Sequence, residues 1–93
     1  MTDTNKITSE AREISIKRMR MRAWHRGIKE MDLILGGWAD DNLAQADDAQ
    51  LEFFEAVLAE DDHDLYQWVS GQVVAPVHYT AFMAVLAEQA RQI

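Results

Sequence analysis

Apolar residues recur three and four positions apart along most of the chain, which is the spacing typical of amphipathic helices. Proline occurs once, and runs of β-branched residues are short. The pattern predicts five helices, which begin at Thr8 or Ser9, at about Arg26 (ending near Ala39), at Asp47 or Asp48, at Asp61 or Asp62, and at Pro76. We therefore predict an all-α fold, a compact five-helix bundle forming a single domain over residues 1–93, with residues 1–8 as a flexible N-terminus.

Each predicted helix carries apolar residues that should face a common core. In chain order these are Ile16, Met19 and Ala23; Ile28, Met31, Leu35 and Trp38, broadened by Leu33 and Ile34; Leu51, Phe54, Val57 and Leu58; Leu65, Trp68 and Val69; and Val77, Ala81 and Val85, with Phe82 and Leu86 as further candidates. Ile14 and Met21 fall on another face of the first helix, so we expect that helix to be only partly buried. The stretch DDNLAQADD is predicted to be a loop, and Gly71 is predicted to end the fourth helix.

The composition is that of an ordinary globular protein, with 48% hydrophobic and 27% charged residues in 93. A chain of this length has one core and no room for separate cofactor and substrate domains. Cysteine is absent, which excludes disulfides, thiolate metal sites and cysteine nucleophiles. No apolar run approaches the roughly 18 residues of a membrane span, and the polar start MTDTNKITSE has no secretory h-region. We expect a cytoplasmic protein without membrane insertion.

Charge is divided unevenly along the chain. Residues 1–29 hold eight basic and three acidic residues, a net charge of +5. Residues 30–93 hold one basic and thirteen acidic residues, a net charge of −12. The basic first helix, with Arg18, Arg20 and Arg22, either docks on an acidic partner or neutralises the acidic body of its own fold. A small nucleic-acid-linked regulator that uses KRMRMRAWHR is the alternative function, but thirteen acids would repel a polyanion, so we expect no nucleic-acid partner.

Catalytic and metal-binding patterns are weak. The acidic run DDHD, residues 61–64, lies where a helix N-cap is wanted, and consecutive helical residues diverge, so capping is favoured over metal binding. His25, His63 and His78 have no partner pattern such as H-E-x-x-H, and Gly36–Gly37 lacks a phosphate-loop frame. The sequence predicts neither an enzyme nor a chain that holds a metal or a dinucleotide.

The five residues RGIKE, residues 26–30, have no evident use for stability. A glycine inside a helix costs about 1 kcal/mol relative to alanine, and an Arg26–Glu30 pair four residues apart recovers only about 0.2–0.5 kcal/mol. Gly27 is explained if the chain turns there, or if another molecule must approach the backbone closely. In the second case Arg26 would present its planar donor group beside a bare patch, with Glu30 as an acceptor one turn on.

These residues resemble the SdhE family of FAD assembly factors. The family pattern R-G-x-x-E-x-D-x-x-L-G-x-aromatic-A is met by Arg26, Gly27, Glu30, Asp32, Leu35, Gly36, Trp38 and Ala39. A second block, an acidic turn leading to Leu-Tyr-x-Trp and then Gly, is met by Asp64, Leu65, Tyr66, Trp68 and Gly71. Gly37 departs from the pattern where a larger, often basic residue is expected, which would loosen the second helix, and Trp38 replaces the more usual phenylalanine.

The resemblance implies a bacterial cytoplasmic factor that binds the flavoprotein subunit of succinate dehydrogenase, of fumarate reductase, or of both. In such a pair the factor promotes covalent FAD attachment, while the chemistry resides in the flavoprotein and the factor itself holds no cofactor. Carried over by position, Arg26, Gly27 and Glu30 would be the docking core, with Asp32 supporting them. Adding Arg18, Arg20 and Arg22 to the partner-binding surface rests on charge alone.

Overall fold

The computed structural model describes residues 9–92, and these are folded as α-helices and 3-10 turns without strands. The elements are α1 (Ser9–Trp24), α2 (Lys29–Asn42), η1 (Leu43–Gln45), α3 (Asp48–Leu58), α4 (Asp62–Ser70), η2 (Val77–Tyr79) and α5 (Thr80–Ala90). The predicted all-α class and the five helices are confirmed for this part of the chain. The predictions of a flexible segment over residues 1–8 and of a cap at Thr8 or by the side chain of Ser9 lie outside what the structure describes.

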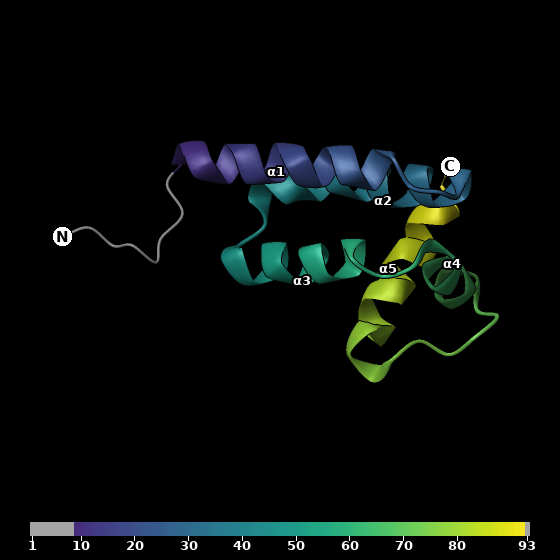
Figure 1. The fold of residues 1–93 in the computed structure, drawn as a ribbon. Coiled ribbons are helices and arrows are strands. Elements are labelled where there is room, and N and C mark those ends of the chain that lie inside the picture. Colours follow the sequence, from purple (N-terminus) through teal and green to yellow (C-terminus); the bar gives the residue numbers. More distant parts are fainter. Residues whose placement is uncertain (1–8, 93) are drawn as a thin grey trace.

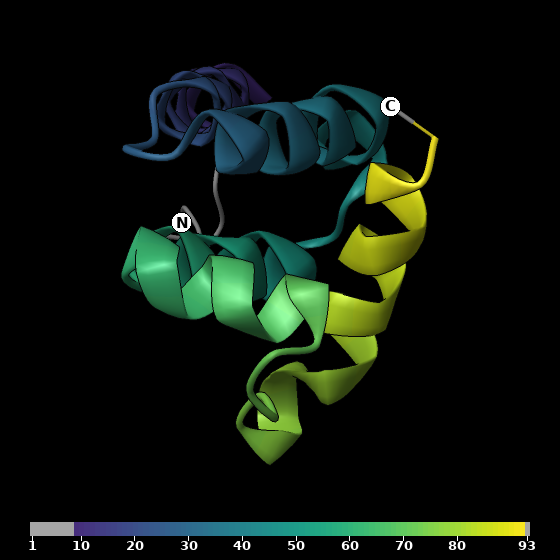
Figure 2. The same ribbon diagram turned by 90° about the vertical axis from the view of Figure 1, so that its right-hand side faces the viewer.

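Two helices, α1 and α2, form a hairpin that packs on the other three helices. α1 and α2 run antiparallel, α3 lies beneath them, and α4 and α5 are at the end where α1 turns into α2 (Figure 1). α5 runs from the side of the molecule opposite the α1–α2 hairpin up to α2, and it packs against α2 and α4 (Figure 2). The turn between α1 and α2 and the turn between α3 and α4 therefore lie at the same end of the molecule.

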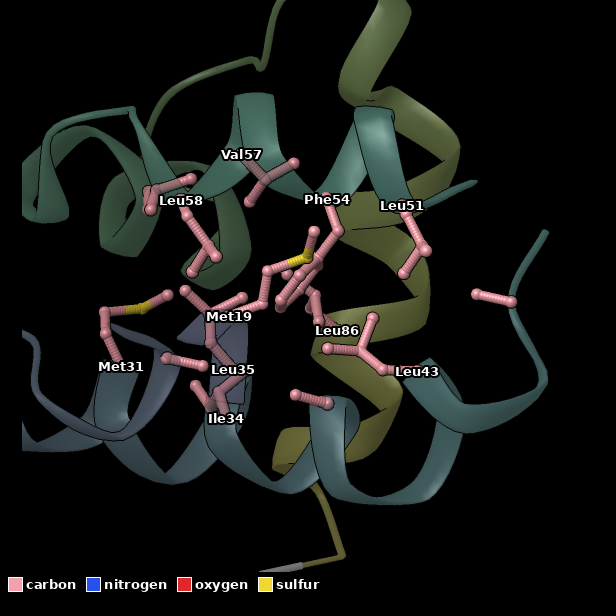
Figure 3. Packing of buried hydrophobic residues seen from close by; sticks show 14 of the residues in the cluster. Met19, Met31, Ile34, Leu35, Leu43, Leu51, Phe54, Val57, Leu58 and Leu86 are labelled. Carbon is pink, nitrogen blue, oxygen red and sulfur yellow. The ribbon is translucent and has the colours of Figure 1, made fainter. Parts of the chain in front are cut away.

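The core fills the space between the hairpin and α3–α5 (Figure 3). The side chains predicted to point inward from α1, α3 and α4 do so: Ile16, Met19, Ala23, Leu51, Phe54, Val57, Leu58 and Leu65 are buried, and Trp68 and Val69 pack against them. Ile14 and Met21 are 47% and 60% exposed, so α1 is half-buried as expected. Met31, Ile34 and Leu35 supply the core face of α2.

The predicted bounds of the second helix are wrong at both ends. α2 starts at Lys29, three residues after Arg26, because residues 25–28 turn the chain back on itself. It continues to Asn42, three residues beyond Ala39, and is followed by a 3-10 turn in which Leu43 is fully buried. The helix was predicted to end early because residues 40–42 are all polar and were assigned to a loop.

The inward face predicted for the last helix is also wrong. Val77 and Val85 are 89% and 48% exposed, and Ala81 is exposed too. The buried residues are Tyr79, Met83 and Leu86, because Pro76 precedes a 3-10 turn, η2, instead of opening α5 directly. Of the predicted candidates, Leu86 is fully buried and Phe82 packs against the core.

The predicted start of α3 and the predicted start and end of α4 are confirmed. Asp47 caps α3 in a reciprocal capping box with Gln50, which satisfies two backbone donors at once. Asp61 caps α4 by accepting a hydrogen bond from the backbone N–H of His63, and this bond is the main reason that the pKa of Asp61 lies below its usual range. Gly71 ends α4 with φ of 84°, a left-handed conformation that favours glycine.

The two departures from the family pattern are accommodated within α2. Trp38 stacks on Phe54 of α3 and meets Phe82 of α5 edge-on, with ring centroids 5.0 Å apart in both pairs. At Gly37 the helix is continuous, and a Cβ would lie 3.0 Å from the side-chain Nε2 of Gln89. The expected loosening at Gly37 is therefore not seen.

Tyr79 gives the fold a dependence on alkaline pH. Its hydroxyl donates to a carboxylate oxygen of Glu60 at 2.9 Å, and burial, this hydrogen bond and the charge of Glu60 raise the pKa of Tyr79 to about 12. The native state thus keeps the phenolic proton at a pH where an unfolded tyrosine, with a pKa near 10, has lost it. We expect about 2 to 3 kcal/mol of stability to be lost as pH rises from about 10 to about 12.

Urea unfolding at several pH values measures this loss. Tyr79→Phe should be less stable at neutral pH by about 1.5–3 kcal/mol, the net value of a hydrogen bond to a charged group, and should show a smaller alkaline decline than the wild type. Equal alkaline slopes in the two proteins would show that Tyr79 is not the responsible group.

Candidate functional site

The RGIKE motif lies in the turn between α1 and α2. Residues 25–28 form this α1–α2 junction, and Lys29 and Glu30 open α2. Gly27 is thus not inside a helix, which corrects the prediction and agrees with the alternative that the chain turns there. No left-handed backbone is needed for the turn, since Gly71 is the glycine with positive φ.

Arg26 is turned inward, and its side chain is only 10% exposed. Its Nε donates to Oδ1 of Asp62 at 2.6 Å, and its two terminal nitrogens donate to the carbonyls of Leu58 and Glu60 at 2.7 and 2.9 Å. These carbonyls lie at the C-terminal end of α3, where a cation is favourable. The expectation that Arg26 presents its donors outward is wrong, because all three donor positions are used within the fold.

Two carboxylates hold the backbone of the α1–α2 junction. Oδ1 of Asp32 accepts from the N–H of Arg26 at 2.5 Å, so Asp32 fixes the backbone at the start of the motif. Oδ2 of Asp62 accepts from the N–H groups of Gly27 and Ile28 at 2.5 and 3.2 Å. Three consecutive amides are therefore satisfied by side chains from α2 and α4.

Gly27 itself is exposed. A Cβ built at this position would have its nearest described neighbour, Oδ2 of Asp62, at 3.5 Å, which is an ordinary van der Waals contact. Neither steric space nor backbone conformation in the described chain requires glycine here. The described part of the fold therefore supplies no reason of its own for glycine at this position.

The surface around Gly27 is open and mixed in character. Glu30 is exposed, and within the described residues its side chain forms no ion pair or hydrogen bond, so the Arg26–Glu30 pair considered from the sequence is not made. A shallow hollow of about 430 Å³ is lined by Met21, Arg22, His25 and Arg26, at the end of α1 and the start of the junction. The junction and its flanking residues thus include a carboxylate without a partner in the described chain, an exposed glycine and a shallow hollow.

The basic residues of α1 are largely paired with the acidic body. Arg12 meets Asp48 at 2.6 Å, Arg20 meets Asp40 at 3.7 Å and Arg22 meets Glu55 at 2.9 Å. This supports the interpretation that the first helix neutralises its own fold. Of the three arginines predicted from charge to bind a partner, Arg18 is exposed and has no ion pair in the described chain. The nucleic-acid alternative gains no support from this arrangement.

The other candidate sites are accounted for by the fold. Asp61 caps α4 and Asp62 contacts the junction, and among residues 9–92 no three His, Cys, Asp or Glu side chains are grouped to hold a metal ion. Gly36 lies within continuous α2 and is covered by the indole of Trp24, so the Gly36–Gly37 pair provides no phosphate cradle. In residues 9–92 no helix has the length and apolar character needed to cross a bilayer.

Sequence reasoning missed one residue of the site, Asp62. It was considered as an alternative cap for α4 and as part of the acidic run weighed for metal binding, but not as a partner of the RGIKE motif. One feature of the sequence could have indicated a second role for Asp62. A single carboxylate suffices to cap a helix, and the run DDHD supplies two carboxylates, Asp61 and Asp62, at the position of the cap.

Comparison with known proteins extends beyond the motif. A family model described as "Flavinator of succinate dehydrogenase", Sdh5, matches residues 17–90. A protein of Mycosarcoma maydis named succinate dehydrogenase assembly factor 2, mitochondrial, is 35% identical over 71 residues, 76% of this chain and 30% of its own length. Proteins of the same name from Meyerozyma guilliermondii and Arabidopsis thaliana are 37% and 30% identical, over 70% and 80% of this chain and 48% and 39% of their own lengths.

The chain spans about a third to a half of the length of these curated relatives. The matched region includes α2 to α5 and the second half of α1, and therefore both the α1–α2 junction and Asp62. On the family match and these identities, the chain belongs to the Sdh5 family of succinate dehydrogenase flavinators, the SdhE-type assembly factors.

Proposed function

We propose that this protein is a FAD assembly factor that binds the flavoprotein subunit of succinate dehydrogenase, of fumarate reductase, or of both, and promotes covalent attachment of FAD to it. Family membership and the assembly-factor names of the relatives support this role. Gly27 and Glu30 form the contact surface, whereas Arg26 and Asp32 hold that surface in place. Arg18, which has no ion pair within residues 9–92, extends the contact. The proposal includes a bacterial cytoplasmic location, although the relatives are named as mitochondrial.

The observation that carries the proposal is the exposed glycine that the fold does not require. Gly27 has room for a Cβ and no positive φ. Because glycine without such a need only adds conformational entropy to the unfolded chain, its presence is best explained by another polypeptide packing against the main chain. Glu30, exposed two positions into α2, adds a charge that this partner can use.

The protein acts by binding and not by chemistry of its own. Binding energy directed at one conformation of the flavoprotein raises the population of that conformation. We propose that the flavoprotein holds the FAD and supplies the reacting groups, because Gly36 and Gly37 of this chain are inside a helix and cannot cradle a pyrophosphate.

Substitution of Gly27 separates stability from function. We expect Gly27→Ala to leave the free energy of unfolding unchanged or to raise it by up to about 1 kcal/mol, since the unfolded chain becomes less flexible. Gly27→Ala should reduce flavoprotein binding, and Gly27→Leu should abolish it. Covalent flavin on the partner, measured by its fluorescence in denaturing gels, and unfolding in urea give the two readouts.

Ala49→Leu is the matched control. Ala49 is exposed in the first turn of α3, at the end of the molecule away from the junction, so the same added bulk should leave flavinylation unchanged (Figure 1). Wild-type flavinylation in the presence of folded Gly27→Leu would rule out the docking surface proposed here.

A further inference from the structure

Asp62 contacts the junction more extensively than any other acidic residue in the described chain. Its Oδ1 accepts from Nε of Arg26 at 2.6 Å, and its Oδ2 accepts from the amides of Gly27 and Ile28. The Asp62 side chain is 11% exposed. One carboxylate from α4 thus binds three donors of a segment that lies 34 to 36 residues earlier in the chain.

The helix that carries Asp62 does not need this carboxylate as a cap. Asp61 caps α4 by accepting from His63. Asp62 benefits from its place in the first turn of α4, where the helix dipole favours a negative charge, but its acceptor oxygens are directed at the junction. The position of Asp62 is therefore explained by the junction and not by α4.

The bonds to Asp62 decide what the junction presents to a partner. Every described peptide bond is trans, and a trans peptide directs its C=O opposite to its N–H. Because the N–H groups of Gly27 and Ile28 point at Asp62, the carbonyls of Arg26 and Gly27 point away from it. No described backbone N–H group bonds to these two carbonyls.

We propose that Asp62 is a positioning residue of the docking surface, which it shapes into a group of hydrogen-bond acceptors, so that the flavoprotein meets Gly27 with donor groups such as backbone N–H, arginine or lysine. This inference rests on the proposed function. The carbonyls of Arg26 and Gly27 and the free carboxylate of Glu30 are the acceptors, while the amides and the guanidinium that could have bound an acidic partner are consumed inside the fold.

The test compares two neighbouring aspartates with the same charge change. Asp62→Asn removes one acceptor oxygen and the charge, so amide hydrogen exchange at Gly27 and Ile28 should accelerate. Affinity for the FAD-free flavoprotein subunit of succinate dehydrogenase, measured by calorimetry with the full chain, should fall about tenfold to a hundredfold, the equivalent of one or two charged hydrogen bonds. Asp61→Asn should leave both quantities unchanged, because asparagine also caps a helix.

Two further variants distinguish a loss of affinity from a general loss of stability. Asp62→Glu keeps a charge for Arg26 but displaces the carboxylate from the two amides, so it should remain folded and still lose affinity. Gly71→Ala introduces strain at a positive φ and lowers stability without touching the junction, so it should bind as the wild type does. A folded Asp62→Glu protein with fast amide exchange and wild-type affinity would overturn the role of Asp62 alone. Absence of binding by the wild type would reject the proposed function, and this inference with it.

Discussion

Replacing Arg26 with methionine is expected to lower the free energy of unfolding by about 3 to 5 kcal/mol, the range found when one partner of a buried ion pair is removed. Methionine keeps the length of the side chain but leaves Asp62 without its cation and the carbonyls of Leu58 and Glu60 without donors. Domains of this kind have total stabilities of about 5–15 kcal/mol, so the loss should be plain in urea unfolding followed by circular dichroism.

Arg12→Met is the matched control. Arg12 also meets an aspartate, Asp48, at 2.6 Å, but the two side chains are 26% and 65% exposed, compared with 10% and 11% for Arg26 and Asp62. An exposed pair contributes at most about 1 kcal/mol. The double variant Arg26→Met with Asp62→Asn should recover part of the loss, since the unpaired charge is then gone. If Arg26→Met is no more destabilising than Arg12→Met, the Arg26 ion pair is not structural.

The second large effect is expected at Gly36. A Cβ at this position would lie 2.3 and 2.4 Å from ring atoms Cδ2 and Cε2 of Trp24, whose indole N–H donates to Asp40 at 3.2 Å. Gly36→Ala therefore forces the indole off α2, and overpacking of this kind costs about 1–3 kcal/mol even though alanine favours a helix. Loss of stability in urea, together with a shift of tryptophan fluorescence as Trp24 becomes more exposed, would be the observed result.

The adjacent glycine should behave in the opposite way. At Gly37 the nearest atom to an added Cβ is the end of the flexible Gln89 side chain at 3.0 Å, which can move aside. Gly37→Ala should stabilise the protein by up to about 1 kcal/mol through helix propensity. As a test of the contact at Gly36, the double variant Gly36→Ala with Trp24→Ala should recover most of the stability that Gly36→Ala loses, because the clashing indole is then absent. Equal effects of alanine at the two glycines would contradict the packing of Trp24 against Gly36.

Helical periodicity was sufficient to predict most of this fold. It identified five helices, and it placed Leu51, Phe54, Val57 and Leu58 on one buried face because α3 obeys regular spacing along its whole length. It failed at α5, since a 3-10 turn after Pro76 rotates the face that the helix buries. Local spacing carries no information on such a rotation, which is set by packing against α2 and α4.

The conformation of the candidate site could not be predicted from the sequence, and its role as a docking surface stays a prediction. Glycine between two charged residues directed attention to residues 26–30, and the structure shows that Asp32 bonds to the backbone of this segment. The inward turn of Arg26 could not be foreseen, because its partners at residues 58–62 are distant in sequence and two of them are backbone carbonyls that any residue supplies. The uneven distribution of charge also allowed two interpretations, docking on an acidic partner or neutralisation of the chain's own acidic residues. The ion pairs of α1 with acidic residues of the same chain favour the second.

The contact between Asp62 and the turn at residues 26–28 joins two segments that are distant in sequence. A newly synthesised chain contains all of RGIKE before α4 is made, so the bonds that Asp62 forms with the turn have to wait for the C-terminal half. On the proposed function, an incomplete copy would therefore be a poor ligand for the flavoprotein, and a short peptide cut from residues 20–40 would contain the motif without these bonds.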